Sequence, residues 1–406
     1  MSSPKVLIGF AEAMAAPEVA WSLVDAGFHV ISFARRGRAS ALRHSRHVEC
    51  HEICPPEKDL QAALADLQSL LGSLPAAADG DQLIFFPLDD KAVWLASRVN
   101  LETGWLLAGP QGANAELALD KCLQTQAARE AGLNVPRTLL ARSANDVRGF
   151  TASESFPIIL KAAECVPVRQ GRLENCRKWV CANPGELERA IAEWAERVPL
   201  LVQPFIMGTG EGVFGLATPD GVRAWSGHRR VRMMNPQGSG SSACISQAVP
   251  EDLRPKIAEL IRRTKWRGLF MIELLRDDSE KLWFVELNGR PWGSMALSRC
   301  QDLEYPAWHV ELALDEHAPV GMEQASAPGV VCRHVGREFM HLLFVLRGAK
   351  SKAMRDWPPF WKTLGDVVRV HRGDAYYNWR RDDAKVFFAD CYYTVHDNVF
   401  KRNTRD

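Results

Sequence analysis

Several features that would narrow the function of this 406-residue chain at once are missing from it. Its charge is nearly balanced, with 50 basic and 49 acidic residues, so the composition gives no reason to expect nucleic acid or an anionic membrane as a partner. No apolar run reaches the roughly 18 residues of a membrane span. The ten cysteines form no C-x-x-C pair, and the first residues lack a signal-peptide pattern. These absences predict a cytoplasmic protein with reduced thiols.

The first hundred residues alternate between strand and helix patterns. Short apolar runs at 5–10, 28–33 and 82–87 have the length and composition of buried strands, and an amphipathic helix pattern covers 58–71. This alternation predicts a parallel, doubly wound sheet. The first strand is followed only by Gly9, without the G-x-G-x-x-G pattern of dinucleotide sites, so neither NAD nor FAD is expected.

A second region begins after the turn-forming residues 109–112. The pattern beyond them predicts a helix over 116–130 and a strand over 156–161. A helix over 186–197 and a strand over 200–206 follow. The region therefore continues as mixed α and β structure without an internal repeat.

The most informative feature is a pair of glutamates in apolar surroundings. Glu273 follows the run Leu269–Ile272, and Glu286 follows the run Leu282–Val285. The polar residues 277–281 between the runs predict a β-hairpin whose register places the two glutamates opposite each other. Two such carboxylates would repel, and a bound cation removes that objection. Oxygen ligands with open positions suit Mg²⁺, which keeps waters and substrate phosphates in its shell.

The strand continues as Glu286-Leu287-Asn288-Gly289-Arg290. Side chains alternate across a strand, so Glu286, Asn288 and Arg290 share one face. Arginine there is suited to phosphate. A solvated face followed by an Asn-Gly turn is the alternative, which the apolar residues before each glutamate disfavour. The pattern predicts a magnesium–nucleotide site.

The order of these features resembles the ATP-grasp superfamily, in the arrangement of the carbamoyl-phosphate-synthase-like enzymes and the carboxylate–amine ligases. The resemblance covers about residues 1–315. It rests on an N-terminal α/β region, a Leu-Asp-Lys helix at 119–121, a strand that ends in lysine at 159–161, a hinge strand at 203–206 and the acidic hairpin. The E-x-N-x-R pattern at 286–290 is the most specific of these motifs.

The resemblance implies an α/β fold with three parts. We expect an N-terminal Rossmann-like pre-ATP-grasp domain, a two-lobed α+β ATP-grasp domain, and a small, partly helical C-terminal extension. The expected bounds are 1–110 for the first, 111–315 for the second with lobes of about 111–200 and 201–315, and 316–406 for the third.

The resemblance also assigns the metal ligands and one phosphate contact. Glu273, Glu286 and Asn288 would hold two Mg²⁺ ions, with Glu286 bridging them, and Mn²⁺ is the alternative metal. Arg290 would contact the transferred phosphate.

The ATP contacts follow from the same resemblance. Two lysines would reach the phosphates, the backbone of the hinge strand would bracket adenine, and an acid would hold the ribose. Lysine supplies a compact charge on a long stem, which suits a phosphate oxygen across a cleft. The residues expected to bind the nucleotide are Lys121, Lys161, Gln203, Phe205, Ile206 and Glu211.

Two departures from the family pattern stand out. Family members usually follow the strand lysine with proline and a glycine-rich lid loop, whereas segment 162–171 contains the single glycine Gly171. Either the lid is built differently, with Arg169 or Arg172 reaching the phosphates, or it closes less tightly. The hinge also begins with Gln203 where an acid is common.

A basic strand over 222–232 supplies candidates for the substrate. Its residues His228, Arg230 and Arg232 alternate onto one face and could bind a substrate carboxylate or an acyl-phosphate. A solvated basic strand is the alternative. The small-residue loop at 238–242 could offer backbone N–H groups to an anion, or be a surface loop.

The resemblance implies an ATP-dependent, ADP-forming ligase. Such an enzyme activates a small carboxylic acid as an acyl-phosphate and couples it to an amine. Two alternatives remain open from the residues, which are a small-molecule kinase that uses the same site and a non-catalytic nucleotide-binding protein. The aromatic and arginine residues of the last ninety positions make nucleic acid conceivable, but their composition favours a domain that packs on the core or a homodimer surface.

Overall fold

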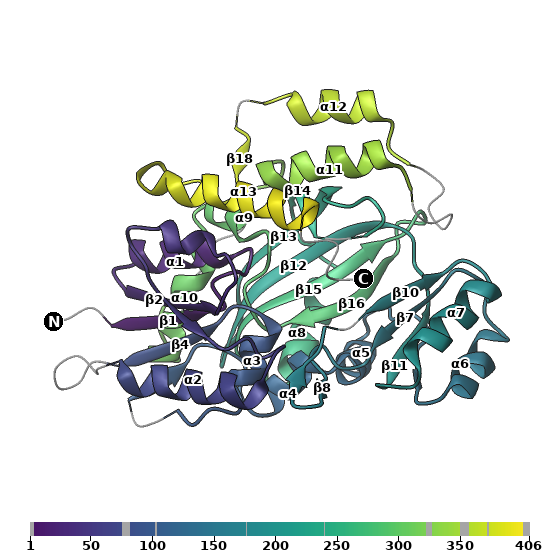
Figure 1. Cartoon of the computed structure of the whole chain (residues 1–406), viewed down its shortest axis with the longest axis horizontal. Helices are drawn as coiled ribbons and strands as arrows, with labels where there is room; N and C mark the ends of the chain where they lie inside the picture. Colours follow the sequence, from purple (N-terminus) through teal and green to yellow (C-terminus); the bar gives the residue numbers. More distant parts are fainter. Residues whose placement is uncertain are drawn as a thin grey trace.

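The computed structural model contains three main sheets and a small two-stranded one. A five-stranded sheet and a four-stranded sheet lie at opposite ends, the seven-stranded sheet lies between them, and the last helices cover it from above (Figure 1). The described residues are 4–74, 82–101, 104–175, 177–238, 240–321, 327–349, 357–371 and 373–400.

The N-terminal sheet is parallel, with strand order β3-β2-β1-β4-β5. Val6 and Ile8 of β1 pack with α1 on one face, while Leu7 packs with α2 on the other. The doubly wound sheet expected from the sequence is confirmed. Its elements are β1 (Lys5–Gly9), α1 (Ala16–Asp25), β2 (His29–Arg35), η1 (Ala41–His44), β3 (Glu49–Ile53), α2 (Leu60–Ser73), β4 (Leu83–Pro87), α3 (Asp90–Ala96) and β5 (Trp105–Leu107).

The helix expected over 116–130 is broken into two helices, α4 (Ala113–Leu119) and α5 (Lys121–Glu130). Asp120 lies between them in an extended conformation, and its carboxylate accepts hydrogen bonds from two N–H groups of the next turn. An aspartate N-cap of this kind stabilises a new helix start. The expectation of one continuous helix was therefore wrong, and the break places Lys121 in the first turn of α5.

The four-stranded sheet is antiparallel, with order β10-β7-β11-β6. Helices α6 and α7 cover one face through Val147, Leu187 and Ile191, among other buried side chains. Strands β8 and β9 follow β7 in the chain and form a short hairpin. The elements are β6 (Leu139–Ala141), α6 (Ala144–Thr151), β7 (Ile158–Ala162), β8 (Val168–Arg169), β9 (Arg172–Leu173), β10 (Lys178–Cys181), α7 (Pro184–Trp194) and β11 (Leu200–Pro204).

The seven-stranded sheet has the order β16-β15-β12-β13-β14-β17-β18 and is antiparallel except for its last pair. Strands β17 and β18 come from beyond residue 315, so the region expected as a C-terminal extension completes this sheet. The elements are β12 (Thr209–Thr218), β13 (Gly221–Met233), β14 (Ser241–Gln247), α8 (Arg254–Arg263), β15 (Gly268–Arg276), β16 (Leu282–Asn288), β17 (Val331–Arg333) and β18 (Ala375–Tyr376).

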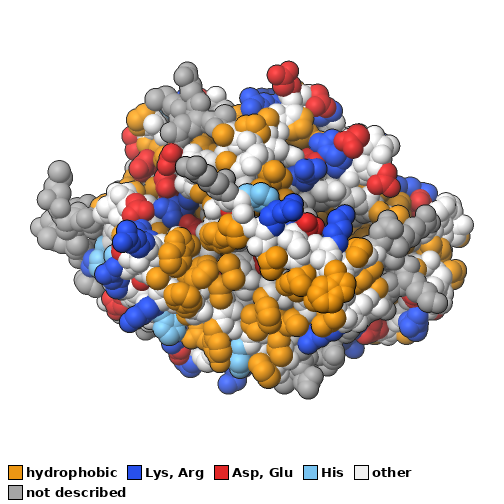
Figure 2. Space-filling view, turned by 90° about the horizontal axis from the view of Figure 1, so that it is seen from above, with side chains coloured by type: hydrophobic (Ala, Val, Ile, Leu, Met, Phe, Trp, Pro, Cys, Tyr) orange, Lys and Arg blue, Asp and Glu red, His pale blue; other side chains and the backbone are white. Residues whose placement is uncertain are grey.

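The remaining helices lie around the end of the sheet and above it. Helices α11 and α13 pack on each other, and α12 contacts α11. Their outer face carries a broad apolar area (Figure 2), to which Phe339, Trp361, Val368, Phe388 and Tyr392 contribute. No helix among the described residues is long and apolar enough to cross a membrane. The elements are α9 (Met295–Arg299), α10 (Tyr305–Leu314), α11 (Val335–Arg347), α12 (Phe360–Val368), η2 (Arg381–Asp383) and α13 (Ala384–Val399).

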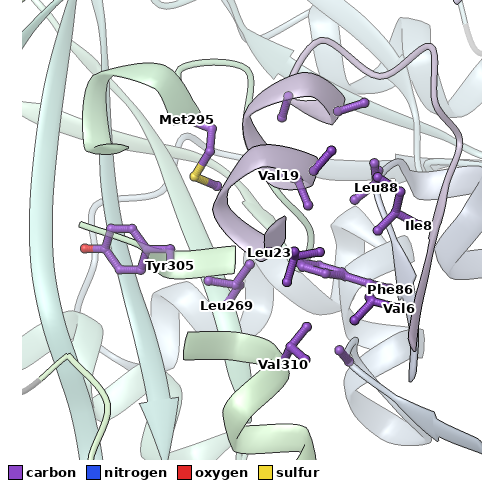
Figure 3. Packing of buried hydrophobic residues seen from close by; sticks show 14 of the residues in the cluster. Val6, Ile8, Val19, Leu23, Phe86, Leu88, Leu269, Met295, Tyr305 and Val310 are labelled. Carbon is purple, nitrogen blue, oxygen red and sulfur yellow. The ribbon is translucent and has the colours of Figure 1, made fainter. Parts of the chain in front are cut away.

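One hydrophobic core joins the N-terminal sheet to the seven-stranded sheet. Val6 and Leu23 from the first sheet and α1 pack in the same cluster as Leu269 of β15 and Val310 of α10 (Figure 3). Burial of such side chains contributes roughly 1.5–3 kcal/mol each. The cluster fixes the α1-covered face of the N-terminal sheet against strand β15 of the acidic hairpin.

Candidate active site

The acidic hairpin forms with the expected register. Strands β15 and β16 pair antiparallel, and Glu273 lies directly opposite Glu286. The turn holds together through Asp277, which accepts hydrogen bonds from the backbone N–H groups of Ser279 and Lys281. The register then shifts by one residue after Glu273, at a β-bulge.

The electrostatics of the two glutamates differ although their positions match. Burial and the neighbouring charge of Glu286 raise the pKa of Glu273, against the opposing charge of Arg230, which donates to Glu273 at 2.6 Å. Burial also acts on Glu286, but the charges of Lys121, Arg290 and Lys161 outweigh it and lower the pKa of Glu286. Two buried carboxylates side by side suit a divalent cation, which relieves their mutual repulsion.

Asn288 and Arg290 lie beside Glu286 as the sequence predicts. The amide of Asn288 donates to Glu286 at 3.3 Å. Arg290 turns its guanidinium to Asp90 of α3, with Nε at 2.9 Å and Nη2 at 3.4 Å from the two carboxylate oxygens. Burial acts to lower the pKa of Arg290, but Asp90 holds it above its usual value. The N-terminal sheet thus positions the arginine that is expected to contact phosphate.

The two lysines lie close enough to the acidic hairpin for their charges to lower the pKa of Glu286. Lys161 lies near the end of β7, where burial lowers its pKa to about 8 although Glu286 opposes the shift. The charge of Lys121 lowers the pKa of both Lys161 and Glu286. The backbone N–H of Lys121 donates to the carbonyl of Ala163 at 2.9 Å. The structure therefore brings both expected phosphate-binding lysines to the metal-binding candidates.

The hinge strand has one free donor. The side chain of Gln203 is buried and donates to Thr138 at 2.7 Å, and the N–H of Phe205 donates to the carbonyl of Pro157 at 2.9 Å. Among the described residues, the N–H of Ile206 has no hydrogen-bond partner. Recognition of adenine by the backbone at 203–206 stays a prediction, with Ile206 as its donor.

Glu211 does not join the site. It lies opposite Leu274, whereas its neighbour Gly212 lies opposite Glu273, so Glu211 points to the other face of the sheet. Its carboxylate is 2% exposed and is held by Arg276 at 2.6 and 3.0 Å. We therefore withdraw the expectation that Glu211 holds the ribose, because alternation along β12 turns it away from the cleft.

Of the three residues of β13 that were predicted to bind substrate, two line the cavity beside the glutamate pair. His228 and Arg230 line the same cavity as Glu273. The register shifts between Arg230 and Arg232, and this bulge breaks the alternation that the sequence analysis assumed. Arg232 instead binds both carboxylate oxygens of Glu338 on α11, with a closest approach of 2.6 Å. The expectation that Arg232 contacts substrate was wrong, because its charge is used to hold the C-terminal extension.

The segment expected as the lid, 162–171, is attached to the N-terminal sheet. The backbone N–H of Leu60 donates to the carbonyl of Gly171 at 2.9 Å, and Lys91 donates to Asn175, just past the hairpin, at 2.7 Å. Leu173 of β9 packs in the core of the N-terminal sheet. A hairpin therefore stands where the family has a glycine-rich loop.

Among the described residues, neither Arg169 nor Arg172 of that hairpin forms an ion pair with the two glutamates. Arg169 lies 3.8 Å from Glu174, and Arg172 is exposed. The lysines consequently provide the positive charge closest to Glu286 on this side, together with Arg290.

A cavity of about 360 Å³ opens beside the glutamate pair. Its walls come from the N-terminal region, the acidic hairpin, strand β13 and the C-terminal extension. Two of its residues, Arg337 and Tyr377, were missed by the sequence analysis, because each lies in a stretch with other arginines or aromatics that no local pattern separates from them. In the sequence, only Gly240, which leaves room for Arg337, could have indicated this part of the cavity. The lining residues used below are His228, Arg230, Gly240, Glu273, Arg337 and Tyr377.

The donor set fits Mg²⁺ that is shared with a nucleotide. No group of three or more His, Cys, Asp or Glu side chains that could hold a metal occurs in the part of the chain that the structure describes. Two carboxylates and the Asn288 oxygen leave coordination positions open, which phosphate oxygens and waters complete for Mg²⁺. The residues present therefore suit a metal that arrives with ATP rather than one in a closed protein cage.

Comparison with known proteins identifies the fold. No family model and no curated protein matches the chain. Among solved structures, an ADP complex of N5-carboxyaminoimidazole ribonucleotide synthetase superposes with a TM-score of 0.61 at 14% identity, over 90% of this chain and 96% of that one. The biotin carboxylase domain of the Hydrogenobacter thermophilus 2-oxoglutarate carboxylase, solved as a dimer with MgADP, ADP and bicarbonate, gives 0.60 at 16%, over 80% and 72%.

An L-amino acid ligase from Bacillus licheniformis is also similar, with a TM-score of 0.56 at 17% identity, over 78% of this chain and 75% of that one. At these identities the likeness establishes the fold. The chain has the fold of these structures, which is the ATP-grasp fold.

Proposed function

We propose that this protein is an ATP-dependent, ADP-forming ligase, which activates a small carboxylic acid as an acyl-phosphate and couples it to an amine. The observation that carries the proposal is the opposed pair Glu273–Glu286, faced by two lysines and one fixed arginine at the edge of a cavity. Similar proteins that are named as an amino acid ligase and as ADP-bound synthetase and carboxylase domains support it.

Glu273, Glu286 and Asn288 would hold the metal, which neutralises phosphate charge when it is bound with ATP. Lys121 and Lys161 would bind the phosphate oxygens. Protein groups that are fixed in place before the reaction stabilise charge most effectively. The bidentate contact with Asp90 provides this for Arg290.

The chemistry has two displacements. A carboxylate oxygen of the acid attacks the γ-phosphorus, the bond to the β,γ-bridging oxygen breaks, and ADP leaves. The amine nitrogen then attacks the acyl carbon, loses a proton, and inorganic phosphate leaves. Arg230 lies on the cavity wall beside Glu273, where it can bind the substrate carboxylate.

The test is ADP release screened over pairs of carboxylic acids and amines, with Mg²⁺. We expect release that requires both substrates, and we expect Glu286→Gln to lower it by about 100-fold or more, because loss of one fixed charge-stabilising group commonly costs that much. Turnover that survives unchanged in Glu286→Gln would refute the site assignment. A stable phosphorylated product without any amine would instead indicate the kinase.

The other expectations from the sequence stay predictions. They are the three-part division of the chain at about residues 110 and 315, the use of two Mg²⁺ or Mn²⁺ ions, a homodimer and a cytoplasmic location. The apolar outer face of α11, α12 and α13 is consistent with association but does not identify what covers it.

A further inference from the structure

The C-terminal extension contributes two side chains to the cavity beside the glutamate pair. Arg337 lies in the first turn of α11, and Tyr377 directly follows β18. Both reach the cavity because β17 and β18 continue the central sheet, and the backbone N–H of Tyr377 donates to the carbonyl of Arg333. The site is thus incomplete without the last seventy residues.

Arg337 makes no ion pair with a carboxylate in the part of the chain that the structure describes. Among the described residues, no carboxylate lies within 4.0 Å of its guanidinium, whose one hydrogen bond is from Nη1 to the carbonyl of Ser241 at 3.3 Å. Asp390 is the acid whose charge raises the pKa of Arg337 most. The carboxylate of Asp390 is bound by His334 and Asn378 at 3.0 Å each. Burial lowers the pKa of Arg337, as expected for an arginine without a partner.

The other arginines at the cavity are paired. Arg230 is bound to Glu273 at 2.6 Å, and Arg290 is bound to Asp90 at 2.9 Å. A partly buried guanidinium has five N–H donors, and leaving them without acceptors is costly. Arg337 is therefore the one of the three without a carboxylate partner among the described residues, although Nε of Arg230 also has no acceptor there.

Glycine makes room for this side chain. A Cβ at Gly240 would lie 2.5 Å from Nη1 of Arg337. The same device occurs at Gly210, where a Cβ would lie 2.7 Å from Cδ of Arg230. The φ angle of neither glycine lies in the left-handed region, so these positions relate to the space next to the two arginines and not to backbone conformation.

Two further buried polar groups line the same cavity as Arg337. Nε2 of His228 is buried without a hydrogen-bond partner among the described residues, and the buried hydroxyl of Tyr377 lies beside the thiol of Cys244 without an oxygen or nitrogen partner there. Nδ1 of His228 is bound to Ser294 at 2.8 Å. A cavity wall that combines a guanidinium without a carboxylate partner and a phenol hydroxyl suits an anion with several acceptor oxygens.

We propose that Arg337 and Tyr377 form a second anion site, which binds an anionic group of a substrate other than the carboxylate that is phosphorylated. The inference rests on the ligase function proposed above and names its substrate class. The group is a carboxylate that belongs either to a dicarboxylic acid or to an amino acid that supplies the amine. The cavity volume of about 360 Å³ admits a molecule of that size.

Calorimetric titration of the whole chain without nucleotide tests this with matched ligands at equal ionic strength. Succinate is compared with butyrate, glutarate with valerate, and β-alanine with ethylamine. We expect at least one ligand with the extra carboxylate to bind about tenfold or more tighter than its partner, and Arg337→Met to raise its Kd by about 10- to 100-fold, as for a charge-assisted hydrogen bond. Tyr377→Phe should cause a smaller loss.

Arg347→Met is the matched control, because Arg347 is exposed at the end of the same helix. It should leave every Kd unchanged. Arg337→Met should melt no lower than the wild type, since the change removes an unpaired charge. Absence of any preference for the extra carboxylate, or an unchanged preference in Arg337→Met, would overturn the proposal, and a lower melting temperature with unchanged binding would assign Arg337 a structural role.

Different results would contradict the anion site and the ligase function. Glu286→Gln should lose ADP release and keep the binding that depends on Arg337. Binding without ADP release by the wild type would contradict the ligase alone. ADP release that is indifferent to Arg337 across the same acids and amines would contradict the anion site alone.

Discussion

Lys161 shows how a single residue in this site costs stability. Its ammonium is buried near the end of β7, and this burial lowers its pKa to about 8 from 10.5, although Glu286 opposes the shift. The unfolded chain holds the proton more tightly than the folded chain does, so the charge destabilises the fold below pH 8, and the cost disappears as pH rises toward 10.5. A lysine kept there at such a cost is better explained by a phosphate ligand than by packing.

We expect Lys161→Met to be more stable than the wild type at pH 7, by up to about 3 kcal/mol at about 1.4 kcal/mol per pKa unit. The difference should shrink between pH 8 and 10.5. The same variant should bind ATP about 10-fold or more weakly, because the phosphate loses its cation. Urea unfolding at several pH values and the KM for ATP measure the two effects. A variant less stable than the wild type at pH 7 would mean that Lys161 serves packing.

The wild-type pH profile follows from the same residue. Only the ammonium form attracts phosphate, so kcat/KM for ATP should fall as pH rises through about 8 in the free enzyme. Steady-state ADP release from pH 6.5 to 9.5 would show this. Because a guanidinium does not titrate in this range, Lys161→Arg should flatten the profile if it retains activity. A wild-type profile that stays flat through pH 9 would contradict the assignment.

At the scale of elements, the acidic hairpin was predictable and the strand beside it was not. The register of Glu273 and Glu286 follows from two apolar runs and one polar turn, which are local in sequence. The bulge after Arg230 depends on how β13 meets β14, and no local pattern reveals it. The break at Asp120 had a local signal, an N-cap residue, that a continuous helical pattern concealed.

The contact between α3 and the end of β16 also could not be predicted from the sequence, because Asp90 and Arg290 are 200 residues apart. We expect Asp90→Asn to lower kcat for ADP release by about 10- to 100-fold with little change in the KM for ATP, because Arg290 loses its fixed orientation. Glu259→Gln is the control, since its ion pair with Arg262 is exposed on α8. Equal kinetics in Asp90→Asn and Glu259→Gln would show that Arg290 needs no support.

At the scale of the whole molecule, the C-terminal extension ties the other parts together. Glu338 accepts hydrogen bonds from Arg232 of the central sheet, Arg333 of β17 and Ser242 of β14. On the other side, Asn378 donates its N–H to Glu18 of α1 at 2.8 Å. The resemblance to the family ended at about residue 315, so this role was outside what the sequence could predict.

Glu338→Gln tests the connection. It leaves the buried Arg333 and the partly buried Arg232 with a neutral partner, and we expect a loss of about 3–5 kcal/mol in the free energy of unfolding. Glu188→Gln is the comparison, because its pair with Arg148 is about half exposed and should contribute at most about 1 kcal/mol. Denaturant unfolding of both variants decides the matter. Similar, small losses in the two would mean that the extension is held by apolar packing alone.

The central claim is that the opposed glutamates hold the divalent metal of a nucleotide, and paramagnetic resonance of Mn²⁺ tests it most directly. Titration of Mn²⁺ with ADP into the protein should show a bound signal, and Glu286→Gln and Glu273→Gln should each weaken it by about tenfold or more, because each removes a charged ligand. Glu280→Gln, in the exposed turn of the same hairpin, should bind as the wild type does. Equal Mn²⁺ binding by Glu286→Gln and the wild type would contradict the account.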